Sequence, residues 1–409
     1  MVGKATIFVV AGFSLLFLIV EYNMGNISTR AVENFTGYYL ENHSREIAVS
    51  GINFAANKIF LDPTWTAGFK DYDFREGKKE GVLNVKVEVV DALKNYRKIT
   101  STGEYQGVKS TVEVMLVPSR FSKFAYYSES EGSNIWWMSK DTVWGPFHTQ
   151  DKMKIDGKPT FYGKVTNKLG IEKKDKNSKA NFYGGYQTAV DLAMPTNEMP
   201  AIEALASSGG KTITGKDTVY LTFVSDSIKV RYTYSGSTST YLSSAFAPNG
   251  IIVAKDAIVR LQGTVKGQYT VVSSSTLSSK GDIYLDNDIV CSNSPRTNQS
   301  SPDILGIVAK NDVIITENSA NNSNINIDAS IYCEAGSFGA QNHSTRPVSG
   351  VINLFGGIVQ KARGAVGTFS GTTIKSGFSK NYRYDERLLL MFPPAFPGTG
   401  GFEIVSWYE

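Results

Sequence analysis

The sequence contains little histidine and little cysteine, and this scarcity excludes several kinds of site. Its 409 residues include three histidines, His43, His148 and His343, and two cysteines, Cys291 and Cys333. Three scattered histidines argue against a histidine-based metal centre or a histidine-dependent catalytic site. Two cysteines are too few for a disulfide framework or an all-cysteine zinc site. We therefore expect no catalytic residue, no metal ligand, no cofactor and no enzyme activity.

Charge is also scarce. Charged residues make up 20% of the chain, and the formal net charge is only +4, whereas about a quarter of the residues of an average globular protein are charged. No basic stripe with interleaved aromatic residues stands out, so we expect no nucleic-acid partner. A chain of this length is expected to form two or three domains.

One long uncharged run is present, from Ala5 to Val20. As a helix it would span about 24 Å, against a hydrocarbon core of about 30 Å. Lys4 precedes the run, which favours an amino terminus on the inner side of a membrane. The run could be a cleaved signal peptide, a plain anchor or a working part of the protein. The following residues, "EYNMGNISTR", offer no A-x-A cleavage site, so we expect no cleavage there.

The helical pattern continues beyond the uncharged run. Apolar residues recur at spacings of three and four, which predicts one stripe along a helix: Met24, Ile27, Ala31, Phe35 and Tyr38, then Ala48, Ile52, Ala55 and Ile59. Asp62 followed by Pro63 is a stop signal. Gly25, Gly37 and Gly51 are positions where we expect bends. The prediction is one helix of about 55 residues, about 80 Å long.

We assign membrane insertion and assembly to the apolar part of this helix. Its residues are Ile7, Phe8, Val9, Val10, Phe13, Leu15, Leu16, Phe17, Leu18, Ile19, Val20 and Glu21. Phe8, Leu15 and Leu18 share one stripe. The sequence leaves open whether that stripe faces lipid or copies of itself.

Residues 80–118 alternate between apolar and polar side chains and predict β-hairpins. Residues 119–165 are rich in aromatic residues. Trp136, Trp137 and Trp144 are candidate sugar contacts, with a buried core cluster as the alternative. His148, Gln150 and Asp151 could form half of a metal site, but a turn held by side-chain hydrogen bonds explains them better.

Five segments between Gly250 and Gln360 repeat one pattern, in which two short apolar strands flank a polar pair. Their second-strand residues Ile289, Val313, Ile331 and Ile358 recur at uneven intervals, which predicts turns of a parallel β-helix. Cys291 and Cys333 then share a register two turns apart, about 9.6 Å. A disulfide needs Cα atoms within about 7 Å, so we expect two free, stacked cysteines.

The same register places Asp288 and Asp312 one turn apart. Two adjacent carboxylates can raise one pKa enough to supply a general acid for polysaccharide cleavage. The alternative interpretation is that both aspartates stabilise turns.

A hydrophobic amino-terminal helix that runs into the amphipathic stretch "ENHSREIAVSGINFAANKIF" and then a β domain resembles type IV pilins and their PilX-type minor relatives. In that family the helix packs against its copies in the filament core. Pilins usually carry a basic leader ending in glycine, with glutamate at the fifth mature position. Here the fifth residue after Gly3 is Phe8, and the first acid is Glu21. The segments "GPFHTQD", "GKPTFYGKVT" and "YDERLLLMFPPAFP" resemble a group of bacterial surface proteins with this architecture.

We expect a mainly β fold with one long amino-terminal helix, in which a pilin-like helix and β-meander precede a parallel β-helix. The expected segments are the helix 1–62, the meander 63–118, an aromatic-rich β region 119–248, β-helix turns 249–372 and a carboxyl-terminal cap 373–409. The expected function is a non-catalytic structural subunit of a type IV pilus-like filament or surface appendage. Its partners would be its own copies or other pilin-like subunits, with the inner membrane before assembly. The alternative is a membrane-anchored bacterial surface protein that binds or cleaves glycans.

Overall fold

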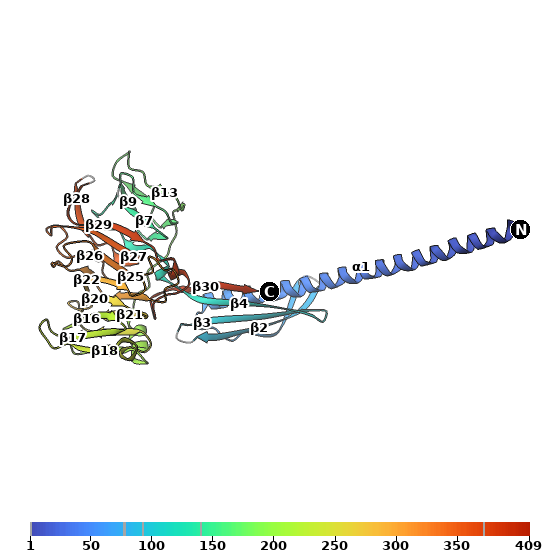
Figure 1. Ribbon diagram of the computed structural model, residues 1–409, viewed down its shortest axis with the longest axis horizontal. Helices are drawn as coiled ribbons and strands as arrows, with labels where there is room; N and C mark the ends of the chain where they lie inside the picture. Colours follow the sequence, from blue (N-terminus) through green and yellow to red (C-terminus); the bar gives the residue numbers. More distant parts are fainter. Residues whose placement is uncertain (1, 77–78, 92–93, 140, 371–372) are drawn as a thin grey trace. The chain divides into compact units, whose positions relative to one another are not determined.

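Two compact units make up the computed structural model of the chain (Figure 1). Unit 1 comprises Met1–Pro118 together with Gly401–Glu409, and unit 2 comprises Ser119–Gly400. The second unit is therefore an insertion within the sequence of the first. The structure describes residues 2–76, 79–91, 94–139, 141–370 and 373–409.

The amino-terminal helix α1 spans Val2–Leu61, which confirms the predicted long helix. Its 60 residues extend about 90 Å at about 1.5 Å per residue. The Asp62 amide donates the last helical hydrogen bond to the Lys58 carbonyl, at 2.8 Å. Pro63 disfavours a helical conformation of the residue before it. The Asp62 side chain accepts from the amide and hydroxyl of Thr64 and fixes the turn after the helix.

The sheet of unit 1 has the order β1-β2-β3-β4-β30. Strands β1 to β4 are consecutive antiparallel neighbours. The hairpin pattern of residues 80–118 predicts β2 to β4, whereas β1 lies before that pattern. The fifth strand comes from the carboxyl terminus, which the sequence instead assigns to a cap. Pairing along a sheet edge uses backbone groups and leaves little local sequence signal. The bounds are β1 (Phe69–Glu76), β2 (Lys79–Asp91), β3 (Tyr96–Tyr105), β4 (Val108–Arg120) and β30 (Gly398–Tyr408).

The second half of α1 packs against this sheet through small and branched residues. The buried ones are Ser44, Ile47, Ala48, Gly51, Ile52, Ala55 and Ile59. They include the second part of the predicted stripe, from Ala48 to Ile59, and they meet Leu83, Ile99 and Val112 in one apolar cluster. A Cβ atom on Gly51 would lie 2.3 Å from the Ser101 hydroxyl. Helix α1 runs through Gly51 unbroken, so this glycine permits close packing and does not mark the expected bend.

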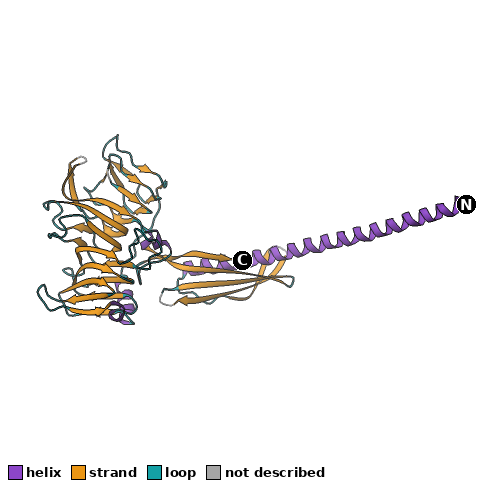
Figure 2. Ribbon diagram, viewed as in Figure 1, coloured by secondary structure: helices purple, strands orange, loops and turns teal. Residues whose placement is uncertain are grey.

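Unit 2 consists mainly of short strands (Figure 2). Its helices are α2 (Met199–Ser207) and α3 (Ser243–Phe246), and its 3-10 turns are η1 (Phe121–Lys123) and η2 (Glu386–Leu389). Its strands are β5 (Tyr126–Ser130), β6 (Trp137–Met138), β7 (Thr142–Trp144), β8 (Phe147–Thr149), β9 (Met153–Asp156), β10 (Thr160–Phe161), β11 (Val165–Asn167), β12 (Ile171–Lys173), β13 (Asn181–Phe182), β14 (Tyr186–Gln187), β15 (Lys211–Ile213), β16 (Thr218–Ser225), β17 (Ser227–Arg231), β18 (Ser239–Leu242), β19 (Ile251–Lys255), β20 (Ile258–Val265), β21 (Gln268–Ser274), β22 (Ile283–Cys291), β23 (Ile304–Ala309), β24 (Val313–Ile315), β25 (Ile325–Cys333), β26 (Phe338–Ala340), β27 (Val348–Ala362), β28 (Gly367–Ser370) and β29 (Thr373–Arg383).

Most strands of unit 2 pair in parallel with a strand from the next repeat. One ladder runs through β15, β19, β21, β23, β25 and β27. A second runs through β16, β20, β22, β24 and β26. Ile307, Ile331 and Ile358 are aligned in successive strands and are almost completely buried. Such stacking, at about 4.8 Å per strand, builds a continuous apolar column.

The first strands of unit 2 stack on its last ones. Strand β5 pairs in parallel with β27, through Tyr126 and Ile358, and the ladder continues through β8, β11 and β14. Likewise β7 pairs with β29 and is followed by β10 and β13. The aromatic-rich strands therefore extend the ladders instead of forming the separate region expected for 119–248. Strand β29, expected in the cap, is also a ladder member, because its backbone pairs with β27 and β7.

A buried charge network lies where β5 stacks on β27. The Glu131 carboxylate accepts hydrogen bonds from the Tyr126 hydroxyl at 2.9 Å, the Ser128 hydroxyl at 2.5 Å and the Trp137 indole at 2.9 Å. It also pairs with the Arg363 guanidinium at 2.9 Å. Both charged side chains are at most 3% exposed. Because the carboxylate has four donors, its burial is compensated.

Both cysteines are free and buried, as predicted. Their predicted common register is wrong. Strand β22 aligns Ile289 with Ile327, an offset of 38, which places Cys291 beside position 329 and not beside Cys333. The predicted column fails at the same place, because Val313 pairs with Ile283 and not with Ile289. The molecule as a whole is mainly β with one long amino-terminal helix, as the sequence predicts.

Candidate functional site

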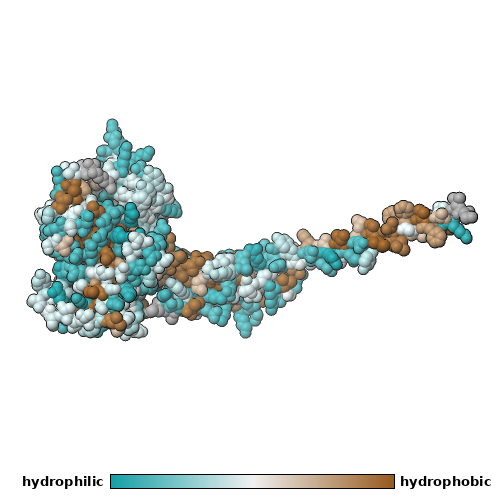
Figure 3. Space-filling view, viewed as in Figure 1, coloured by the Kyte–Doolittle hydropathy of each residue, from teal (hydrophilic) through white to brown (hydrophobic). Residues whose placement is uncertain are grey.

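The apolar first part of α1 is the most unusual surface of the chain. Residues 3–39 are all exposed. The apolar residues assigned to insertion and assembly, Ile7 to Val20, have exposed fractions between 48% and 77%. Figure 3 shows hydrophobic residues gathered along these turns. Burying a large apolar side chain is worth about 1.5–3 kcal/mol, so this surface is stable only against another apolar phase.

By length and composition, α1 could cross a membrane. Its most apolar window of 18 residues has a mean hydropathy of 2.2, and none of that window is buried within the chain. Core helices of soluble proteins meet the same criterion of length and composition, but they are covered by their own fold. Here the apolar window has no such cover.

The exposed stripe does not end at Glu21. Met24, Ile27, Phe35 and Tyr38 are between 66% and 72% exposed. The unit 1 sheet begins to bury side chains of α1 only around Leu40, which is partly buried. A length of apolar stripe therefore lies between the membrane-like run and the folded part of unit 1.

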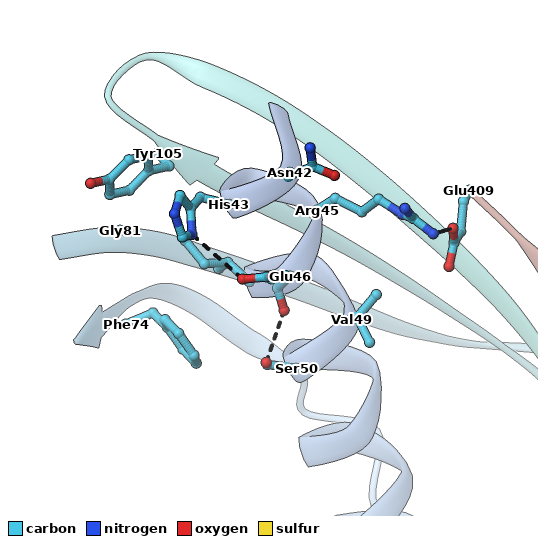
Figure 4. Close-up of a pocket in the computed structure, with 11 residues that line it drawn as sticks. Asn42, His43, Arg45, Glu46, Val49, Ser50, Phe74, Gly81, Tyr105 and Glu409 are labelled. Carbon is cyan, nitrogen blue, oxygen red and sulfur yellow. Dashed lines mark hydrogen bonds and ion pairs between the residues drawn. The ribbon is translucent and has the colours of Figure 1, made fainter. Parts of the chain in front are cut away.

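A pocket of about 570 Å³ lies in unit 1 where that cover begins (Figure 4). It was not predicted, because its lining combines α1 with β1, β2, β3 and the carboxyl-terminal residue: Asn42, His43, Arg45, Glu46, Ile47, Val49, Ser50, Phe74, Gly81, Tyr105 and Glu409. Its charged groups pair with one another. Arg45 forms an ion pair with Glu409, and His43 lies 3.4 Å from the Glu46 carboxylate. His43 also packs edge-on against Tyr39, so its position in the helix is explained by packing.

The three candidate tryptophans have three different environments. Trp137 is buried, and its indole donates to Glu131, so it belongs to the core. Trp144 is 40% exposed, but its ring stacks on Tyr162 at 3.7 Å, and Tyr162 stacks on Tyr183. Tyr162 covers one face of the Trp144 ring, and the Arg383 guanidinium lies 5.7 Å from the ring centroid, so neighbouring side chains engage this ring. Trp136 lines a groove of unit 2.

Asp288 and Asp312 are not neighbours. The Asp288 carboxylate accepts from the amide and side chain of Asn326, at 2.8 and 2.9 Å. Asn326 accepts in turn from Asn353, which makes Asp288 the end of an amide ladder. Asp312 accepts from Ser337 instead, and its amide donates to Asp282. Both aspartates therefore accept hydrogen bonds from backbone amides: Asp288 from Asn326 in strand β25, and Asp312 from Ser337.

The Asp282 carboxylate is the one that faces Asp312. Burial raises the pKa of Asp282, the hydrogen bond from the Asp312 amide lowers it, and the Asp312 charge raises it. The net direction is upward.

His148 is a core residue. It is completely buried, and its two ring nitrogens are hydrogen-bonded to the Thr166 hydroxyl at 2.8 Å and to the Gln150 side-chain oxygen at 3.2 Å. Burial lowers its pKa. The nearby Asp151 accepts from the Glu131 amide, so this segment is the hydrogen-bonded turn. Among the described residues, no group of three histidine, cysteine, aspartate or glutamate side chains could hold a metal ion.

No protein-family model matches this chain. No curated protein matches it either. Among solved structures it is similar to the crystal structure of the competence-associated pilin ComZ from Thermus thermophilus, with 11% sequence identity and a TM-score of 0.41. That similarity covers 90% of this chain and 97% of the other.

Proposed function

We propose that this chain is a non-catalytic structural subunit of a type IV pilus-like filament or surface appendage. Helix α1 holds the subunit in the inner membrane before assembly and then packs against copies of itself or other pilin-like subunits. Unit 2, whose parallel ladders we interpret as a β-helix, is displayed at the bacterial surface. The resemblance of the first 60 residues to pilins supports this proposal, and so does the exposed apolar length of α1.

One observation carries the proposal. Residues 3–39 are exposed, and at about 1.5 Å per residue they span about 55 Å. A membrane covers about 30 Å of that length. The remaining exposed stripe, which includes Ile27 and Phe35, would stay in water if the chain were only an anchor. Sister helices packed side by side would cover both parts.

The proposal is tested with sheared surface material from cells that express the full chain. Electron microscopy should show filaments, and mass spectrometry should find this chain in them. Leu15→Arg places a charge in the apolar run, which costs about 2.5–3.5 kcal/mol at the centre of a membrane helix. This variant should abolish surface display, while Asp288→Asn, in the amide ladder, should leave display intact. Absence of the chain from every filament fraction would contradict the proposal.

The alternative function is a membrane-anchored protein that binds or cleaves glycans. Cleavage has little support, because Asp288 and Asp312 are committed to separate hydrogen bonds. Binding needs no acid pair, and a different part of unit 2 supports it.

A further inference from the structure

A groove of about 680 Å³ lies in unit 2 and is separate from the apolar helix. We call it the Trp136 groove. Two backbone segments, 132–135 and 364–368, form part of its lining. Its volume falls in the range of about 300–1,000 Å³ that is typical of small-molecule sites. The side chains that carry the argument are Trp136, Asp156, His343, Asn134 and Lys380.

Several polar side chains of the groove keep their hydrogen-bonding capacity. In the described part of the chain, no side-chain hydrogen bond or ion pair engages the Asp156 carboxylate, the His343 imidazole, the Asn134 amide or the Trp136 indole N–H. Asp156, His343 and Trp136 are also only partly exposed. The Asp288 carboxylate of unit 2, which is also partly exposed, is by contrast hydrogen-bonded to Asn326. Convergent unpaired polar groups beside an aromatic ring are the usual features of a ligand site.

The charges of the described lining residues do not favour an anionic ligand. Its one ammonium group, Lys380, is 10% exposed and pairs with Asp141 at 3.0 Å. Among the described residues that line the groove, the carboxylate without a partner is Asp156, which repels phosphates and nucleic acid. A lone carboxylate is also a poor cation site, because hard cations need several oxygen ligands.

We propose that the Trp136 groove binds a neutral saccharide. Lys174 lies over the Trp136 ring, 4.8 Å from its centroid, and so occupies one face of the indole. The electron-rich opposite face attracts the polarised C–H groups of a sugar ring. Asp156 accepts from sugar hydroxyls, while Asn134 and the Trp136 N–H donate to them. This binding does not depend on filament assembly, so it goes beyond the proposed structural role.

The test measures binding of the full chain in detergent by isothermal titration calorimetry. The probes are neutral oligosaccharides with gluco, manno, galacto and N-acetylhexosamine configuration, at millimolar concentration. At least one should bind. Trp136→Ala and Asp156→Asn should each weaken that binding by about tenfold or more, as the loss of a ring contact or a charged hydrogen bond predicts. The control is Trp144→Ala, which removes an exposed tryptophan outside the groove and should leave the affinity within about twofold.

Circular dichroism shows whether each variant folds. Asp156→Asn keeps the size of the side chain, so this variant still tests the groove if Trp136→Ala does not fold. The proposal is overturned if no probe binds the wild-type chain, or if binding survives Asp156→Asn unchanged. It is also overturned if Trp144→Ala weakens binding as much as Trp136→Ala. A failure of the filament experiment leaves these outcomes untouched, because binding is measured on the isolated chain.

Discussion

Glu131 and Arg363 are 232 positions apart in the sequence, yet they form a buried ion pair with 2.9 Å between a carboxylate oxygen and a guanidinium nitrogen. The pair joins β5 to the end of β27, at the point where the first strands of unit 2 stack on the last. The Arg363 guanidinium also lies 3.9 Å from the Trp137 ring centroid. Long-range closure of the ladders and core packing therefore depend on the same residues.

Removal of one partner of this pair should destabilise unit 2 strongly. Glu131→Gln leaves the Arg363 charge buried without its counter-ion, which costs about 3–5 kcal/mol in the free energy of unfolding. Urea denaturation followed by circular dichroism measures this value. The control is Glu88→Gln, in an exposed ion pair with Lys86, which should change stability by less than about 1 kcal/mol. Equal effects of the two substitutions would show that the buried pair does not hold the ladders together.

Glycine at the contact between helix and sheet should tolerate no side chain. A Cβ atom at Gly103 would lie 2.2 Å from the Ser44 carbonyl oxygen and 2.6 Å from the Ala48 nitrogen, both backbone atoms of α1. Gly103→Ala should therefore destabilise unit 1 by about 1–3 kcal/mol, as overpacking does. Gly37→Ala is the matched control, because a Cβ atom there would meet no neighbouring residue within 4 Å, and it should stabilise α1 by about 1 kcal/mol. Thermal unfolding of the two variants distinguishes them by sign.

Asp282 should make stability depend on pH. Because burial and the nearby Asp312 charge raise its pKa in the folded chain, its contribution to stability is fully present below the ordinary aspartate pKa. That contribution is lost as the pH rises through the raised value. Asp282→Asn keeps the oxygen that accepts from the Asp312 amide and mimics the protonated acid. The variant should be more stable than wild type at neutral pH, and the difference should vanish at acidic pH. The measurement is the free energy of unfolding of both proteins as a function of pH. If the difference between variant and wild type stays constant across the pH range, the titration of Asp282 is not its cause.

The two thiols should be unreactive in the folded chain. Both are buried, and burial raises the pKa of Cys291 to about 12 and that of Cys333 still higher. The thiolate is the reactive form. A colorimetric thiol reagent should therefore label neither cysteine in the native protein and both after denaturation. Rapid labelling of the native chain would mean that the ladders open around β22 or β25.

The parts of the fold that depend on local pattern were predictable. The stripe Ala48, Ile52, Ala55 and Ile59 identified the covered face of α1, because helical spacing alone determines which residues share a face. The hairpin strands within residues 80–118 were also predicted, and they form β2 to β4. The role of Gly51 was not, because close approach depends on what the facing sheet presents.

Register and stacking order were not predictable in the same way. A long loop separates Cys291 from Ile304, so equal spacing in the repeats does not place Asp288 beside Asp312. A prediction from the repeat period also assumes that strands stack in the order of the chain. In the structure, Tyr126 of the early strand β5 instead pairs with Ile358 of the late strand β27. The Trp136 groove combines Asp156 with His343, and no spacing in the sequence brings these two together.

The central claim is that the exposed stripe of α1 contacts copies of itself. The most direct measurement is oxidative crosslinking of a Leu15→Cys variant in the sheared surface fraction, since both native cysteines are buried and give no background. The account predicts disulfide-linked dimers for Leu15→Cys and none for wild type. Monomers alone in that fraction, with the variant cysteine still open to a lipid-soluble thiol reagent, would contradict it and leave α1 as a lipid anchor.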